Sequence, residues 1–175
     1  MSRSISRGAF RSLPPARAEE VGLEAVEAER LVVGLVTAGP EIEERASALL
    51  REGESTRALL LDAAGSAAAE EAADLLGAIV AGQEHGQSAA RVGCRVSPGY
   101  GPWPLQSQRL LFKTLPHLEV GVSLTRSLLM VPRKSISFAM WMGESGQPRR
   151  APGGCESCGL ESCRHRRRRP RKEEK

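Results

Sequence analysis

The sequence predicts an α+β domain in which an antiparallel sheet packs against helices. Three observations support this prediction: a β-branched run at 31–39, alanine- and leucine-rich stretches of helical character at 41–80, and two further strand candidates at 120–124 and 135–141. Hydrophobic residues make up 41% of the 175 residues and aromatic residues only 3%, so Leu, Val, Ile and Ala must build the core. This length suits one domain with flexible ends.

The N-terminal half divides into an arm, a strand and helices. Residues 1–20 carry Ser, Arg, Gly and two adjacent prolines, which predicts a flexible or loosely docked arm. Residues 21–30 suit the start of a strand or a short helix. The run LVVGLVTAG at 31–39 indicates a buried strand, which Gly39 and Pro40 end. A helix follows from residue 41, with acidic residues in its first turn, and Gly53 ends it.

A second helix is expected from Thr56 to about Ala64, and its run of three leucines at 59–61 predicts burial. Residues 67–80 form a third helix or continue the second. Residues 81–94 are a polar loop, and the Gly/Pro-rich residues 95–108 cannot be regular structure. A short helix at 108–116 precedes the two late strands, and Pro132 stops the element between them.

Charge is distributed unevenly along the chain. Residues 164–175 hold eight Lys/Arg and two Glu, so their net charge of +6 exceeds the +4 of the whole chain. The other residues therefore carry about −2, which argues against a basic domain face for nucleic acid. We accordingly expect a folded domain at 21–143, a linker at 144–154, and a Cys-rich basic tail at 155–175. The basic run at 164–172 suits a solvated tail better than a nucleic-acid site.

No uninterrupted apolar run approaches the roughly 18–20 residues of a membrane span. The first residues are positively charged but lack the apolar core of a secretory signal. We therefore expect a cytoplasmic protein that neither crosses nor requires a membrane.

The most informative segment is RVSPGYGPWP at 95–104. Pro98 stiffens it and Gly99 permits a positive φ, so the segment can hold its backbone against a ligand. Arg95 offers a planar fork that suits a carboxylate, and Tyr100 offers a flat ring and a hydroxyl group. The alternative is a surface turn with Tyr100 packed on the core.

This segment resembles the activation (reactivation) domain of cobalamin-dependent methionine synthase. The resemblance rests on Arg-X-Ser-Pro-Gly-Tyr, then a short helix, then Gly-X-X-Leu-Thr-X-Ser-X-X-Met-X-Pro-X-X-Ser-X-Ser at 121–137. The upstream strand, its helix and the Asp-Ala-X-Gly-Ser helix pair at 31–76 are also similar. The match covers about two-thirds of the chain, and the shorter, separate-subunit version of the domain is the closer match.

The resemblance implies the same α+β fold and a role in reductive methylation of cob(II)alamin held on a partner chain. It implies that S-adenosylmethionine is the methyl donor, that Arg95 holds its carboxylate, and that backbone at Ser97, Pro98 and Gly99 contacts it. Tyr100, the predicted catalytic residue, would lie near the corrin face and the sulfonium methyl. The implied partners are a methionine synthase or another corrinoid protein and an electron donor; the protein itself supplies positioning and electrostatics.

Some residues differ from the family pattern. Arg126 stands where the family commonly has Glu, and Tyr100 is the sole tyrosine, so the family's C-terminal tyrosine pair is missing. Asp74 lies on a helix where the family carries a carboxylate near its site. The Arg126 change, together with the lack of an acidic ligand contact that the family's N-terminal portion supplies, motivates a second hypothesis, a non-catalytic module that caps a corrinoid methyltransferase protein.

The tail carries a cluster of possible metal ligands. Three thiolates within nine residues can converge on one ion, with a histidine as the fourth ligand for zinc: Cys155, Cys158, Cys163 and His165. An iron–sulfur cluster with a fourth ligand from elsewhere, such as Cys94, is the alternative. A third hypothesis follows, a metal-binding adaptor that acts through this tail.

Other residues suggest simpler roles. Arg133 and Lys134 lie within the matching motif, where they either contact a phosphate or carboxylate of the corrinoid or are solvated. Trp103 and Trp141 are predicted to be packing residues. No nucleophile elbow or paired-acid motif supports a hydrolase.

Overall fold

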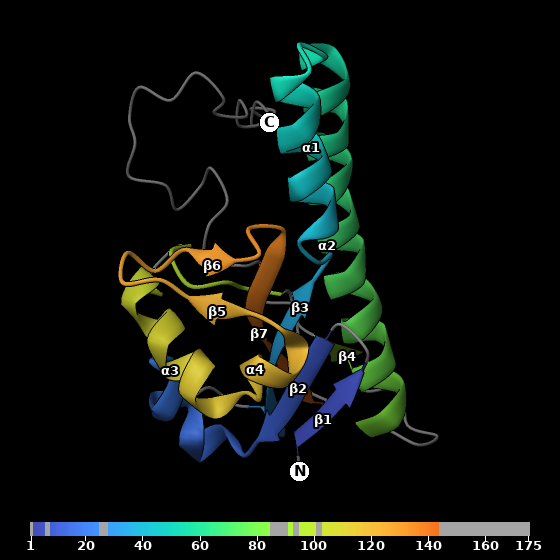
Figure 1. Cartoon of the computed structure of the whole chain (residues 1–175). Coiled ribbons are helices and arrows are strands. Elements are labelled where there is room, and N and C mark those ends of the chain that lie inside the picture. The colour runs from blue at the N-terminus through green and yellow to red at the C-terminus, as the bar shows by residue number, and fades with distance from the viewer. Residues whose placement is uncertain are drawn as a thin grey trace, which may run out of the picture.

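The computed structural model describes residues 2–5, 8–24, 28–84, 91–92, 95–100 and 103–143. Five strands form one antiparallel sheet in the order β1-β2-β3-β7-β4, and β5 and β6 form a separate two-stranded sheet (Figure 1). The strands of the large sheet are β1 (Ser2–Ile5), β2 (Gly8–Leu13), β3 (Arg30–Thr37), β7 (Ser135–Gly143) and β4 (Arg91–Val92). The predicted α+β class, an antiparallel sheet with packed helices, is confirmed.

Strand β3 lies at the centre of the sheet and is buried on both faces, which explains its unbroken apolar sequence. Leu31, Val33 and Leu35 point into one core, and Val32 and Val36 point into the other. Gly34 makes room for a neighbour: a Cβ there would lie 2.5 Å from the Phe138 ring. The period of two along a strand therefore sends alternate side chains of one run into two cores.

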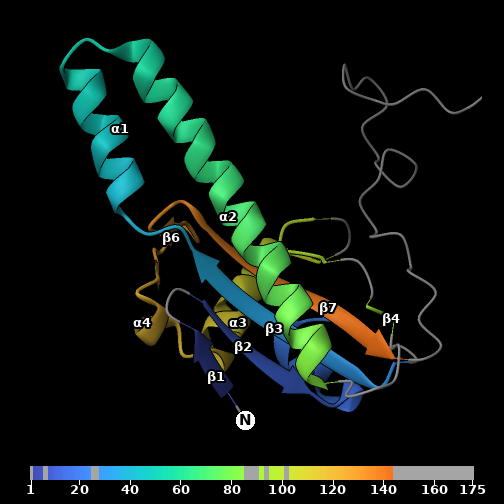
Figure 2. The same ribbon diagram turned by 90° about the vertical axis from the view of Figure 1, so that its right-hand side faces the viewer.

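Each face of the sheet has its own cover. The first core includes Trp103, Leu111 and Val122 from residues 103–122, and Val21 from the N-terminal segment. The elements on this side are η1 (Pro15–Val21), η2 (Leu105–Ser107), α3 (Gln108–Thr114) and α4 (His117–Val120). The second core lies under one long helix, α2 (Ser55–Glu84), which contributes Ala73, Leu76 and Val80 (Figure 2).

Helices α1 (Glu41–Arg51) and α2 form a hairpin that extends beyond the end of the sheet (Figures 1 and 2). Three acidic residues occupy the first turn of α1, and Gly53 follows its end with a φ of +83°, as predicted. The two helices expected at 56–64 and 67–80 are one continuous helix, which confirms the alternative that the second continues. Gly65 does not break it; a Cβ there would lie 2.7 Å from Ile42 of α1.

The prediction that the leucine run at 59–61 is buried was wrong. Leu59 is 70% exposed and Leu60 is 66% exposed. Successive residues of a helix are separated by about 100°, so three in a row cannot all face one neighbour. On this part of α2, Ala58 and Gly65 are buried instead.

The prediction of a flexible or loosely docked arm at 1–20 does not hold for residues 8–20, which form β2 and most of η1. Strand β2 pairs with β1 and β3, and Ala9, Phe10 and Leu13 are fully or almost fully buried. Pro15 does not interrupt the folded structure. It begins η1, since proline suits the first turn of a helix. The stability of this segment comes from pairing with β3, some 20 residues later, and local composition carries no sign of it.

The remaining elements follow the prediction with small shifts. The expected loop at 81–94 contains the end of α2 and strand β4, and the irregular segment at 95–108 contains η2. The helix expected at 108–116 is α3, which confirms that prediction. The strand expected at 120–124 shortens to β5 (Ser123–Leu124), which pairs with β6 (Met130–Val131), and the strand at 135–141 is β7. The predicted linker and tail lie outside the described residues.

Candidate functional site

The segment from Arg95 to Tyr100 is attached to the sheet through β7. Val96 and Ala139 exchange two backbone hydrogen bonds, with N···O distances of 2.9 and 2.8 Å. This bridge fixes the backbone immediately before the Ser-Pro-Gly-Tyr sequence. The segment is therefore an irregular loop that rests on a rigid strand, an arrangement common in binding sites.

Residues Ser97 to Tyr100 form a tight turn. The Tyr100 N–H donates to the Ser97 carbonyl oxygen at 3.2 Å, and Gly99 has a φ of +92°. Proline at the second position and a positive φ at the third are the features of a type II turn. The Gly99 N–H donates to the Trp103 carbonyl oxygen at 2.8 Å, which closes the loop on its far side. The predicted turn, which Pro98 stiffens and in which Gly99 permits a positive φ, agrees with this geometry.

Trp103 anchors this loop to the core. Its side chain is buried, and its indole N–H donates to the Val21 carbonyl oxygen at 3.0 Å. Trp141 is partly buried against the same core. The packing role predicted for both tryptophans is confirmed.

Arg95 joins the loop to helix α2. Its Nη2 donates to Glu70 at 2.5 Å and to Asp74 at 3.1 Å, and its guanidinium carbon lies 5.6 Å from the centroid of the Phe138 ring. The Arg95 side chain is 22% exposed, whereas the two carboxylates are 62% and 68% exposed. Both contacts use the same nitrogen, so Nε and Nη1 are not engaged by these carboxylates.

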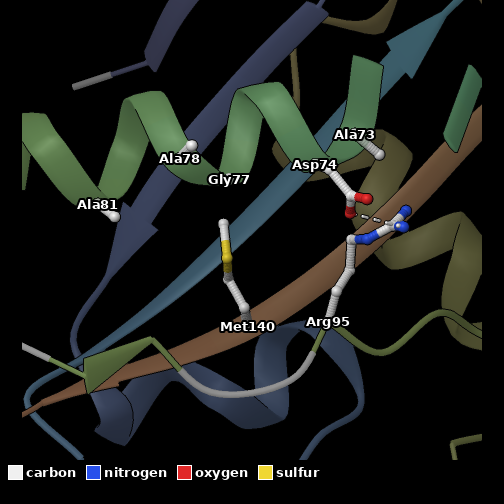
Figure 3. Close-up of a pocket in the computed structure, with 7 residues that line it drawn as sticks. All are labelled: Ala73, Asp74, Gly77, Ala78, Ala81, Arg95 and Met140. Atoms are coloured by element: carbon white, nitrogen blue, oxygen red, sulfur yellow. Dashed lines mark hydrogen bonds and ion pairs between the residues drawn. The ribbon is translucent and has the colours of Figure 1, made fainter. Parts of the chain in front are cut away.

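An open pocket lies beside this ion pair. Its volume is about 240 Å³. Figure 3 shows Asp74 and Arg95 facing each other at one end, with Met140 of β7 opposite the small residues of α2. The lining residues are Ala73, Asp74, Gly77, Ala78, Ala81, Arg95 and Met140. Small side chains on one turn after another of α2 leave the space that a longer side chain would fill.

Tyr100 is 68% exposed, so the alternative that it packs on the core was wrong. Ser97 is partly buried, Pro98 is buried, and Gly99 is exposed. The structure thus gathers the sequence-predicted residues Arg95 to Tyr100 into one loop at the surface. Sequence reasoning named Asp74 but missed Glu70; the signal that marks both is their i, i+4 spacing on one helix face.

The second part of the matching motif forms the loop between β5 and β6. The Thr125 hydroxyl accepts a hydrogen bond from the Leu129 N–H at 3.0 Å, and Leu128 has a φ of +67°. Arg109 donates to the Arg126 carbonyl oxygen at 3.1 Å. Thr125 and Ser127 of this motif therefore shape a turn. Arg126, which lies between them, is exposed.

Arg133 and Lys134 bind helices of the same chain. Arg133 donates to Glu43 of α1 at 3.2 Å, and Lys134 Nζ lies 2.8 Å from Asp62 and 2.9 Å from the Ser66 hydroxyl of α2. Only 11% of the Lys134 side chain is exposed, so the view that it is merely solvated was wrong. The hydrogen bond from Lys134 lowers the pKa of Asp62 below its usual value. These contacts hold the helical hairpin to the β6–β7 connection.

The predicted metal ligands Cys155, Cys158, Cys163 and His165 lie outside the described residues, as does Cys94. Within the part of the chain that the structure describes, no three His, Cys, Asp or Glu side chains are grouped to hold a metal ion. His117 is engaged locally: its Nδ1 lies 2.8 Å from the Val122 carbonyl oxygen.

No helix of the described residues is both long enough and apolar enough to cross a membrane.

Comparison with known proteins gives a structural match only. No protein-family model matches the chain, and no curated protein does so. Ten chains of solved structures match. One is described as the MetH reactivation domain bound to AdoHcy, with a TM-score of 0.57 and 21% sequence identity. The match covers 67% of this chain and 41% of that one, so this chain spans less than half of that chain's length. The chain therefore has the fold of the MetH reactivation domain, which confirms the resemblance predicted from its sequence.

Proposed function

We propose that this chain takes part in the reactivation of cobalamin-dependent methionine synthase, and that it binds S-adenosylmethionine and docks on a corrinoid protein. Two independent observations support the proposal. The chain shares its fold with a reactivation domain that was solved with AdoHcy, the molecule that remains when S-adenosylmethionine loses its methyl group. Of the motif residues that suggested the function, Arg95 lines an open pocket, and residues 96–100 continue from it as one loop bridged to β7.

The geometry of Arg95 is the observation that carries the proposal. Its guanidinium is held at the pocket by Glu70 and Asp74, yet those two contacts occupy a single nitrogen. A carboxylate ligand can take the remaining edge in the paired geometry that arginine favours. The two exposed carboxylates give the same place a negative charge, which suits a ligand that also carries an ammonium and a sulfonium group.

The chemistry of the proposed step needs an electron and a methyl group. A donor reduces cob(II)alamin by one electron, and the reduced cobalt takes the methyl group from the sulfonium, leaving AdoHcy. In this scheme Arg95 and the backbone at 97–99 hold the methyl donor. The exposed ring of Tyr100 would face the corrinoid chain. The backbone bridge from Val96 to Ala139 of β7 would keep Arg95 and Tyr100 in position.

Calorimetric titration with S-adenosylmethionine tests the proposal. We expect the wild-type protein to bind and Arg95→Ala to weaken binding by about 1.5–3 kcal/mol, the scale of a lost hydrogen bond to a charged group. Arg45→Ala is the control, because Arg45 also pairs with a glutamate, Glu52, but lies on the hairpin away from the pocket. Wild-type protein without affinity for S-adenosylmethionine, or equal losses in both variants, would contradict the proposed site.

A second candidate is a module that caps a corrinoid protein without using S-adenosylmethionine. The observation that favours it is the existing double contact of Arg95 with Glu70 and Asp74, which gives the guanidinium internal partners. This candidate predicts binding to a corrinoid methyltransferase in a pull-down that Tyr100→Ala weakens, without any heat of binding from S-adenosylmethionine.

The Cys-rich tail remains a separate prediction. A zinc ion or an iron–sulfur cluster on Cys155, Cys158, Cys163 and His165 would suit electron delivery or an adaptor role. Metal and sulfide content after anaerobic purification, with and without residues 150–175, tests it. We also propose that the protein is cytoplasmic.

A further inference from the structure

The outer face of helix α2, on the part that extends beyond the sheet, is exposed and mostly apolar. This face consists of Arg57, Leu60, Ala64, Ala67, Ala68 and Glu71, and all six are exposed. Ala58, Gly65 and Ala69, which lie roughly 100–140° around the helix from Ala64, are buried. Figures 1 and 2 show α1 along one side of this part of α2, while the sheet lies beyond its other end. An apolar helix face of this kind commonly marks an interaction site.

The spacing of the outer face matches helix-to-helix packing. Arg57, Ala64 and Glu71 are separated by seven residues, with Leu60 and Ala67 between them. This is the period of a helix pair packed along one seam. Alanines at the seam allow two helix axes to approach closely, near the short end of the usual 8–10 Å range. The face thus suits another helix as its occupant.

The order of charged, large and small residues along the face indicates that the partner helix is α2 of a second copy. The positive Arg57 lies seven residues before Ala64, and the negative Glu71 lies seven residues after it, each about 10.5 Å away along the axis. The large Leu60 lies four residues before Ala64, and the small Ala68 lies four residues after it. The face is therefore opposite in charge and in size on the two sides of Ala64.

A two-fold axis at Ala64 makes such a face complementary to itself. In an antiparallel pair, Arg57 of each copy meets Glu71 of its partner, and Leu60 of each copy packs over Ala68 of its partner. A parallel pair would place like charges together, which is unfavourable. An antiparallel pair centred on Glu71 would be unfavourable too, because it would place the two copies of Glu71 against each other. The same surface contributes on both sides, as a two-fold dimer requires.

We propose that this chain forms a two-fold homodimer through the outer face of α2, with the helices antiparallel and centred on Ala64. Within one chain Arg57 makes one long ion pair, 3.8 Å from Glu54, and its side chain is 72% exposed, so it can also contact a carboxylate of a second chain. Among the described residues, Glu71 makes no ion pair or hydrogen bond through its side chain. The dimer goes beyond the proposed function and does not depend on it.

Charge reversal with sedimentation velocity tests the dimer on the full chain, with a reductant present to prevent crosslinks through cysteine. We expect a concentration-dependent dimer in the wild type. Arg57→Glu and Glu71→Arg should each raise the dimer dissociation constant about tenfold, because each places two like-charge contacts in the symmetric interface. The double variant Arg57→Glu/Glu71→Arg should return to within about threefold of the wild type, since it restores both pairs.

Two adjacent leucines provide the matched control. Leu60→Arg should abolish the dimer, whereas Leu59→Arg, about 100° away around the helix, should leave it intact. Both leucines are exposed, at 66% and 70%, so each variant should fold with unchanged helical circular dichroism. The proposal is overturned by a wild type that stays monomeric at every concentration, by equal effects of the two leucine variants, or by a double charge variant no better than the singles.

Discussion

Helix α2 passes through two different environments, and the difference between them separates stability from interaction. Its C-terminal part lies on the sheet, where Ala73, Leu76 and Val80 are buried against Phe138 and Met140. Its N-terminal part packs on α1 and on Lys134 of the β6–β7 connection, with Ala58 and Gly65 buried, and it leaves Leu59 and Leu60 exposed. The same apolar composition therefore builds a core in one part and a surface in the other. We infer that the sheet-bound part fixes the candidate site, while the extended part is available for contact with other chains.

The largest expected effect comes from cutting a core side chain on the sheet. Phe138 is fully buried and packs on Gly34. Phe138→Ala should lower the free energy of unfolding by about 3–5 kcal/mol, through lost burial and the cavity that remains. Urea unfolding followed by circular dichroism measures it.

Leu59→Ala on the extended part is the counterpart. Because Leu59 is 70% exposed, its loss should change the free energy of unfolding by less than about 0.5 kcal/mol. Comparable losses in the two variants would mean that the exposed part of α2 is as important for stability as the core.

A smaller effect is expected where the two parts meet. Lys134 binds Asp62 and lowers its pKa. A carboxyl group with a lowered pKa stabilises the fold above its unfolded value of about 3.9 and loses this contribution as the pH falls through the folded value. Asp62→Asn should therefore reduce the loss of stability below about pH 4, with little change in the shape of the curve near neutral pH.

Thermal melts of the wild type and Asp62→Asn across the acid range test this prediction. Identical pH profiles would mean that this ion pair does not contribute to holding the hairpin. Glu52→Gln is a suitable control, because Glu52 pairs with Arg45 within the hairpin and away from the sheet.

How much of this structure the sequence predicts depends on whether the deciding contacts are local. The turn at Ser97–Tyr100 was predictable, because Pro98 and Gly99 set its backbone by themselves. Strand β3 was predictable because burial on both faces leaves an unbroken apolar run. The family resemblance then led from the loop to the correct fold.

The features that sequence reasoning missed depend on contacts between distant segments. Strand β2 is stable through its pairing with β3, and nothing within GAFRSL identifies that partner. Glu70 contacts Arg95 from 25 residues away along the chain. The exposure of Leu59 and Leu60 depends on where α1 lies, which a helical pattern does not reveal.

The most direct test of the central claim is a reductive methylation assay. It uses cob(II)alamin on a methionine synthase that lacks its own reactivation domain, with a one-electron reductant and S-adenosylmethionine, and it follows methylcobalamin by its absorption. We predict that methylcobalamin forms when this chain is added, and much more slowly when Arg95→Ala replaces it. Equal rates with and without the chain, or with wild type and Arg95→Ala, would contradict a role in reactivation through this site.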